Sequence, residues 1–305
     1  MDNTQLLQAI KSEKTKSGTL ILSHVYQSPD IIRCADIVGD SFLLSKKAAQ
    51  SGAERIIMCG VRFMAQTVKL LCPGACVILP VPEASCPMAQ QITPERVLEF
   101  KRANPQAAVV CYINTTAELK AVCDVCVTSS SAVKIVSRLP NRDILFIPDK
   151  NLGSYVRRAL PDKNLILWEG CCPVHNAVTE RDVLDIKAQY PDAVFAVHPE
   201  CPPEVTRHAD FIGATTEIVS YAKSQAGRVI IGTEQSIAQF LNLEDNTDRF
   251  IQLKPGAFAC EGMRMTRLEH VYRALTGEGG EQIQIDGATA AAAKRCLDNM
   301  LMMGK

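Results

Sequence analysis

Three cysteines recur at nearly equal spacing along this chain of 305 residues. Cys86 lies 86 residues before Cys172, and Cys260 lies 88 residues after it. Each cysteine follows a short apolar run and stands in a loop of small residues, within the sequences ASCP, GCCP and ACEG. Equal spacing in similar surroundings predicts an internal repeat of roughly 87 residues, because a copied structural unit carries its residues with it.

The offsets of 88 and 86 residues also relate polar residues that end, or closely follow, strand-like runs. The matching sets are His24, Tyr112 and His198; Tyr26, Asn114 and Glu200; Asp36, Asp124 and Asp210; and Ser41, Ser129 and Thr215. Many matches at one period are hard to obtain by chance, so we interpret the chain as three homologous units. We expect them at 1–92, 93–178 and 179–266, with helices in 267–305 completing the first unit.

Strand-like and helix-like segments alternate throughout the chain. The expected strands are 19–25, 55–58, 76–81, 107–112, 144–147, 165–168, 193–197, 229–231 and 250–253. This alternation predicts the α/β class with parallel sheets, in which binding groups lie beyond the carboxyl ends of the strands. We expect three pseudo-threefold-related αβα domains, whose polar sets converge on a central cluster and active site.

The charge balance excludes some classes of partner. With 33 basic and 33 acidic residues the net charge is zero, so bulk electrostatics favour neither nucleic acid nor an anionic membrane. The sequence shows no secretory signal and no run of about 18 apolar residues, so we expect a cytoplasmic protein without a membrane span. In that compartment the 13 cysteines are expected to be reduced thiols, with a minority acting as metal ligands.

One thiolate from each unit suits a [4Fe-4S] cluster in which the fourth iron has no protein ligand and acts as a Lewis acid. Zinc is the competing ion, but structural zinc favours four ligands at short spacing. Cys171 adjoins Cys172 and points elsewhere, so we choose Cys172 for its matching offsets. His175 either orients this cysteine loop or makes a simple structural hydrogen bond.

Two further patterns have both a functional and an ordinary interpretation. Cys123 and Cys126 form a CxxC motif, but the repeat aligns them with small apolar residues, so we expect core thiols. Ser41, Ser129 and Thr215 are expected to open helices, where free backbone N–H groups bind anions; ordinary helix caps are the alternative. The set Tyr26, Asn114 and Glu200 has diverged in chemistry, as one asymmetric substrate requires.

Motifs over nearly the whole chain resemble those of the quinolinate synthase family of NAD biosynthesis. They are HVY (24–26), GDS (39–41), YINT (112–115), TSS (128–130), PDKNLG (148–153), GCCPVH (170–175), HPEC (198–201) and GTE (232–234). The resemblance implies three pseudo-symmetric αβα domains around a [4Fe-4S] cluster held by three cysteines. It also implies condensation of iminoaspartate with dihydroxyacetone phosphate to quinolinate, with loss of phosphate and water.

The resemblance also assigns residues. The cluster ligands fall on Cys86, Cys172 and Cys260, and the acid-base pair falls on Tyr26 and Glu200. The substrate-holding residues fall on His24, Ser41, Tyr112, Asn114, Ser129, His198 and Thr215. Ala214 and Gln66 depart from the serine and glutamate that are usual in the family.

An aspartate-oxidising enzyme is the partner expected to supply iminoaspartate. Two alternatives stay open: another [4Fe-4S] hydro-lyase acting on a carboxylic acid, and a non-catalytic iron-sulfur sensor or small-anion binder. The divergence of Tyr26, Asn114 and Glu200 favours an enzyme, because a binding protein needs no acid-base pair.

Overall fold

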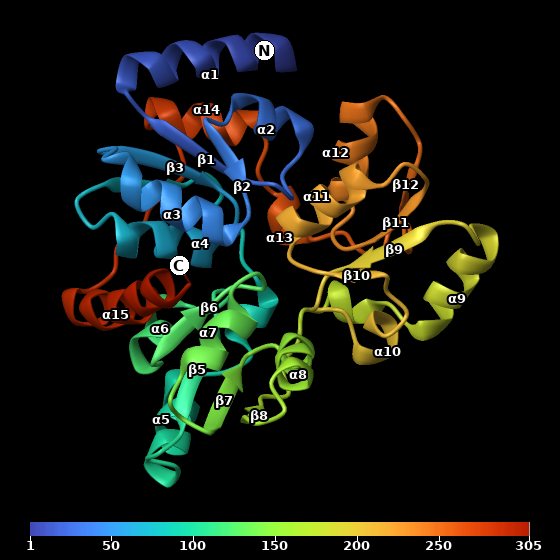
Figure 1. Cartoon of the computed structure of the whole chain (residues 1–305). Helices are drawn as coiled ribbons and strands as arrows, with labels where there is room; N and C mark the ends of the chain where they lie inside the picture. The colour runs from blue at the N-terminus through green and yellow to red at the C-terminus, as the bar shows by residue number, and fades with distance from the viewer. Residues whose placement is uncertain (305) are drawn as a thin grey trace.

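Three separate β-sheets organise the computed structural model, which describes residues 1–304 (Figure 1). Within this range each sheet contains four parallel strands, and the strand order is the same in all three. The second strand of each unit lies at one edge, followed by the first, the third and the fourth. Each unit also has the same succession along the chain, in which a helix precedes every strand.

The bounds of the elements follow this succession. The first unit comprises α1 (Asn3–Ser17), β1 (Leu20–His24), α2 (Pro29–Cys34), β2 (Ile37–Gly39), α3 (Ser41–Ser51), β3 (Arg55–Cys59), α4 (Arg62–Leu71) and β4 (Cys76–Leu79). The second comprises α5 (Pro94–Ala103), β5 (Ala108–Tyr112), α6 (Ala117–Val122), β6 (Val125–Val127), α7 (Ala132–Arg138), β7 (Asp143–Ile147), α8 (Lys150–Ala159) and β8 (Asn164–Leu167). The third comprises α9 (Glu180–Gln189), β9 (Val194–Val197), α10 (Pro203–Thr206), β10 (Phe211–Ile212), α11 (Thr215–Ser224), β11 (Val229–Gly232), α12 (Ser236–Asp245) and β12 (Phe250–Gln252).

The C-terminal segment returns to the first two sheets. After α13 (Glu261–Arg264), α14 (Leu268–Thr276) packs on α1 and β3, and β13 (Glu281–Gln282) pairs antiparallel with β4. The last helix, α15 (Gly287–Met303), packs on α6 and β6 of the second unit and also contacts α4 of the first. Figure 1 shows it, in red, beside both units. None of the helices in residues 1–304 has the length and apolar character that a membrane span needs.

An aspartate–lysine clamp occurs once in each unit. The aspartate accepts the backbone N–H of a residue in the unit's first strand. A lysine from the helix that precedes this strand pairs with the same carboxylate. The bonds are Ile21 N–H to Asp36 (2.8 Å) with Lys14 (2.8 Å), Val109 N–H to Asp124 (2.7 Å) with Lys101 (2.6 Å), and Phe195 N–H to Asp210 (2.7 Å) with Lys187 (3.8 Å). The clamp ties each helix to its sheet, and its recurrence agrees with the repeat in the sequence.

The cysteines of the CxxC motif are buried, as expected for core thiols. Cys126 is fully buried on β6, and Cys123 lies just before that strand. Cys111 on β5 and Cys296 on α15 are buried beside them, and the sulfurs of this second pair lie 3.6 Å apart. This group of thiols therefore forms part of the contact through which the last helix covers the second sheet.

Candidate active site

Three of the four polar sets matched by the repeat lie around one pocket. It is lined by His24, Tyr26, Ser41, Tyr112, Asn114, Ser129, His198, Glu200 and Thr215, so all three units contribute to it. His24 and Tyr112 end strands β1 and β5, and His198 directly follows β9. The carboxyl ends of the first strands of the three sheets therefore meet at the same place.

The two histidines at the strand ends are held by the turns that follow them. Nδ1 of His24 accepts the N–H of Tyr26 at 3.2 Å, and Nδ1 of His198 accepts the N–H of Glu200 at 3.3 Å. Burial lowers the pKa of His24 to about 4 and that of His198 to about 3. Both rings are therefore neutral near pH 7 and present Nε2 for hydrogen bonding rather than positive charge.

Glu200 is a buried carboxylate in this pocket. Its Oε2 lies 2.8 Å from Nδ1 of His175 and 3.6 Å from Nδ1 of His198. Burial alone would raise the pKa of Glu200, but the two histidines and the nearby Tyr112 hydroxyl lower it to about 2. Oε1 of Glu200 is buried and has no hydrogen-bond partner within residues 1–304, so a donor from a ligand can satisfy it.

The phenol of Tyr26 is positioned by two hydroxyls of the third unit. Its oxygen lies 2.9 Å from Oγ1 of Thr215 and 2.9 Å from Oγ1 of Thr233. Burial, with the neighbouring charge of Glu200, holds the pKa of Tyr26 well above its usual value. Tyr26 is therefore a protonated donor whose orientation is fixed from another unit.

The prediction about helix openings is correct for two of its three residues. Ser41 and Thr215 are the first residues of α3 and α11. Asp40 caps α3 by accepting the N–H of Leu43, whereas Ala214 stands at the N-cap position of α11 without a side-chain hydrogen bond. The prediction for Ser129 is wrong, because α7 begins only at Ala132. Ser131 is the N-cap residue of α7, and its hydroxyl accepts the N–H of Thr128 at 2.9 Å. Residues 128–131 therefore form a turn, and the helix begins after it.

A second cavity, of about 380 Å³, is lined by Cys86, Cys172 and Cys260. Burial raises the pKa of the Cys86 thiol to about 12, and it also raises the pKa of Cys172 and of Cys260. The charges that the other cysteines would carry add to the shift at Cys86 and Cys172. Three thiolates in this place therefore require a cation among them. Cys171 is not among the lining residues in the described chain.

Buried acids and a close backbone contact position these cysteine loops. The N–H of Cys172 donates to Asp149 at 3.0 Å, and that of Cys260 donates to Glu234 at 3.4 Å. A Cβ atom at Gly262 would clash with the carbonyl oxygen of Ser85, so glycine lets the loop of Cys260 approach the loop of Cys86. The segment that follows β12 and the loop that follows β4 thus approach closely through their backbones beside the cavity.

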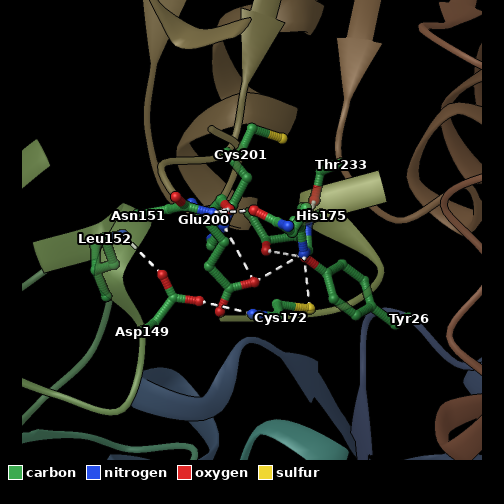
Figure 2. Close-up of polar contacts among 12 residues, drawn as sticks. Tyr26, Asp149, Asn151, Leu152, Cys172, His175, Glu200, Cys201 and Thr233 are labelled. Carbon is green, nitrogen blue, oxygen red and sulfur yellow. Dashed lines mark hydrogen bonds and ion pairs between the residues drawn. The ribbon is translucent and has the colours of Figure 1, made fainter. Parts of the chain in front are cut away.

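His175 lies between Cys172, which lines the cysteine cavity, and Glu200, which lines the polar pocket (Figure 2). Its Nε2 lies 3.0 Å from Oγ1 of Thr233, while its Nδ1 faces both the sulfur of Cys172 and Glu200. Potential ligand atoms of Cys172, His175 and Glu200 all lie within 4.8 Å of one another, a spacing compatible with one metal ion. Cys172 therefore belongs to two candidate ligand sets, one with the other cysteines and one with His175 and Glu200.

The structure adds residues to which sequence reasoning gave no role. Asp149 and Glu234 hold cysteine loops, and Thr233 contacts both Tyr26 and His175. All three lie inside the PDKNLG and GTE motifs. The sequence motifs therefore contained these residues, although no role was assigned to them. Gln66, noted as a departure, accepts the N–H of Ala117 at 3.3 Å through Oε1, so it contacts the segment that follows Asn114.

Comparison with known proteins agrees with this geometry. The family model described as "Quinolinate synthetase A protein" matches residues 8–302. A protein of Alkaliphilus metalliredigens named quinolinate synthase is 43% identical over 302 residues, covering 99% of each chain. Proteins of the same name from Clostridioides difficile (40% identical; 98% of this chain and 97% of the relative) and Clostridium perfringens strain 13 (40% identical; 100% of both) are similar over their full length.

A family match over this range, together with relatives of at least 40% identity along the entire chain, extends beyond the site motifs to all three sheets. The chain belongs to the quinolinate synthase family.

Proposed function

We propose that this chain is a quinolinate synthase that condenses iminoaspartate with dihydroxyacetone phosphate and releases phosphate and water. The observation that carries the proposal is the convergence of polar residues from three units on one pocket, joined through His175 to a cavity lined by three thiols. An aspartate-oxidising enzyme would supply the first substrate. We place the reaction in the cytoplasm, where thiols stay reduced.

The proposed architecture is a pseudo-threefold arrangement of units 1–92, 93–178 and 179–266, in which α14 and β13 complete the first unit while α15 covers mainly the second. The shared strand order and the recurring aspartate–lysine clamp support three related units. A pseudo-threefold axis would direct the same strand end of each unit toward the centre. Each unit would then contribute one cysteine and three polar residues to the catalytic centre.

The donor set fits a [4Fe-4S] cluster. Cys86, Cys172 and Cys260 would hold it, because these half-buried cysteines surround one cavity. Their thiol pKa values are raised, and a cationic centre would lower them. When bound, such a cluster supplies a Lewis acid at the iron that lacks a protein ligand. Asp149 and Glu234 would orient two of the ligand loops through the backbone of Cys172 and Cys260.

Tyr26 and Glu200 would move protons during isomerisation, cyclisation and dehydration. Glu200 is ionised near pH 7, and its free Oε1 can accept a proton. A carboxylate with a pKa of about 2 is a weak base, so we expect it to act together with the hydrogen-bonded ring of His175. The protonated phenol of Tyr26 can donate, and the hydroxyls of Thr215 and Thr233 hold it in place.

The remaining pocket residues would bind the anionic groups of the substrates. The first turns of α3 and α11 present free N–H groups beside Ser41 and Thr215, and the neutral rings of His24 and His198 offer further hydrogen bonds. At about 50 Å³ the pocket has room for only a few waters, since a cavity needs roughly 10–15 Å³ to hold one. Two substrates therefore require the surrounding loops to move apart.

Anaerobic purification followed by iron and sulfide assay and a single-turnover assay for quinolinate tests the proposal. We expect stoichiometric cluster and formation of quinolinate from iminoaspartate and dihydroxyacetone phosphate. A cluster-loaded protein that binds quinolinate but makes none would favour the anion-binding alternative.

The mixed ligand set of Cys172, His175 and Glu200 supports a single zinc ion as the competitor of the cluster. One metal ion held by Cys172, His175 and Glu200 would leave Cys86 and Cys260 without a ligand role. Zinc accepts this mixture of sulfur, nitrogen and oxygen donors. Stoichiometric zinc without iron after anaerobic purification would favour this ion over the cluster.

A further inference from the structure

Lys120 is a buried cation beneath the pocket. Only 1% of its surface is exposed, and its Nζ lies 5.7 Å from the centre of the Phe63 ring. The ammonium donates to the carbonyl oxygens of Ile113 (2.8 Å) and Thr115, and to Oγ1 of Thr115 (3.2 Å). Within residues 1–304 no carboxylate forms an ion pair with it. Burying an ammonium without a counter-ion is costly, so its place calls for an explanation.

The carbonyls that bind Lys120 lie on either side of Asn114. The N–H of Thr115 donates to the Ile113 carbonyl at 2.8 Å, so Asn114 is the apex of a tight turn. Because a trans peptide is planar, the N–H of Asn114 points opposite to the Ile113 carbonyl and away from the ammonium. Asn114 lines the pocket, and its N–H has no acceptor in the part of the chain that the structure describes.

The other two units differ at this place. The N–H groups of Tyr26 and Glu200, which match that of Asn114, are occupied by Nδ1 of His24 and His198. The second unit has Tyr112 in the place of those histidines, and so has no ring nitrogen to accept the bond. At the offsets of 88 and 86, Lys120 corresponds to Ile32 and Thr206. A free N–H and a buried lysine therefore occur together in one unit, and the turn does not need the lysine in the others.

The pocket itself has a shortage of positive charge. In the described chain no lysine or arginine lines it, and its two histidines are neutral near pH 7. Asp40 and Glu200 add negative charge to the lining. An anionic ligand would meet repulsion there unless a cation behind the wall compensates, and at an effective dielectric of about 20 a charge acts over several ångströms.

We propose that Lys120 and the backbone N–H of Asn114 form a subsite for a carboxylate group of the ligand. The lysine is a positioning residue: it holds the turn so that the N–H stays free, and it supplies the positive potential that the pocket lining lacks. The choice of a carboxylate rests on the proposed function, because the substrate iminoaspartate and the product quinolinate are dicarboxylates.

Three substitutions separate the hydrogen bonds of Lys120 from its charge. Lys120→Gln keeps an N–H donor and loses the charge, Lys120→Arg keeps both, and Lys120→Met loses both. Lys101→Met is the control, because Lys101 also donates to a carbonyl oxygen, that of Val122 at 3.3 Å, but makes no bond to the turn at Asn114 and pairs with Asp124 instead. Thermal unfolding of each anaerobic, cluster-loaded protein establishes that it is folded.

Titration calorimetry with quinolinate and with the monocarboxylate nicotinate then measures the effect. We expect Lys120→Gln to weaken quinolinate binding about tenfold and nicotinate binding less, with Lys120→Arg and Lys101→Met close to the parent. A merely structural role would weaken both ligands equally. Unchanged quinolinate affinity in folded Lys120→Gln, or equal losses for the two ligands, would overturn the subsite. A parent protein that binds quinolinate but forms none would instead contradict the proposed function and leave the subsite standing.

Discussion

Nδ1 of His175 lies 3.3 Å from the sulfur of Cys172. The same nitrogen lies 2.8 Å from Oε2 of Glu200, so one ring atom faces both the cysteine loop and the carboxylate of the pocket. One N–H at this nitrogen cannot donate fully to both acceptors. A cation bound by the sulfur would therefore change how strongly this N–H stabilises the negative charge of Glu200.

Replacement of His175 by glutamine distinguishes the two candidate ligand sets. If the three cysteines hold a cluster, His175→Gln should retain iron and sulfide while turnover falls at least about tenfold, because Glu200 loses its closest partner. Metal analysis and single-turnover quinolinate formation measure the two effects. Loss of metal to the same extent as in Cys172→Ser would make His175 a ligand and favour the mixed set.

The cysteine assignment predicts a sharp difference between neighbours. Cys86→Ser, Cys172→Ser and Cys260→Ser should each remove the brown chromophore, because each eliminates one sulfur of the cavity. Cys171→Ser should keep it. The backbone of Cys171 is held by Gln91, which accepts its N–H at 2.7 Å and donates to its carbonyl at 3.1 Å. Anaerobic absorbance spectra decide, and the reverse pattern at 171 and 172 would exchange their roles.

Gly262→Ala should impair cluster loading through the backbone. The added methyl group would clash with the Ser85 carbonyl and push the loop of Cys260 away from that of Cys86. Overpacking of this kind costs about 1–3 kcal/mol of stability. We expect lower iron content and a lower unfolding temperature. Gly74→Ala is the control, because a Cβ atom there meets no neighbour within 4 Å. Equal iron content in both variants would show that the contact does not matter.

The proposed acid-base pair should affect rate more than binding. Tyr26→Phe and Glu200→Gln should lower single-turnover rates by about 10²- to 10⁴-fold while quinolinate affinity changes little. Asn114→Ala should weaken binding as well, because an amide can orient a substrate but transfers no proton. Tyr155→Phe on α8 is a control outside the pocket. Rates near that of the parent in both Tyr26→Phe and Glu200→Gln would refute the assignment.

Much of the fold could be predicted from the sequence. The repeat indicates three similar units, and strands that are apolar along their whole length are easy to recognise. Strand β5, buried at every position, is the clearest case. The second strand of each unit was missed. Strands β2, β6 and β10 have only three, three and two residues, too few for a period to be recognised. Their pairing with the first strand is decided by tertiary contacts instead.

The pocket lining was predictable, but the contacts that orient it were not. The repeat identifies positions that share a strand end, and in a parallel sheet this is enough to bring them together. Lys120 gave no such signal, because its matches are Ile32 and Thr206. The contact of Tyr26 with Thr233 joins residues 207 positions apart, and no local pattern encodes such a pair.

The C-terminal segment packs back on the first unit, and this affects the order in which the units can complete their structure during synthesis. Each aspartate–lysine clamp closes within 24 residues, so it can form soon after its segment leaves the ribosome. Sheets two and three contain only strands made in succession. The first sheet, in contrast, gains β13 at residues 281 and 282, and α14 packs on β3 only after residue 268 has emerged. The first unit to be translated therefore stays incomplete until the C-terminal segment has emerged, and the second sheet gains its covering helix α15 later still.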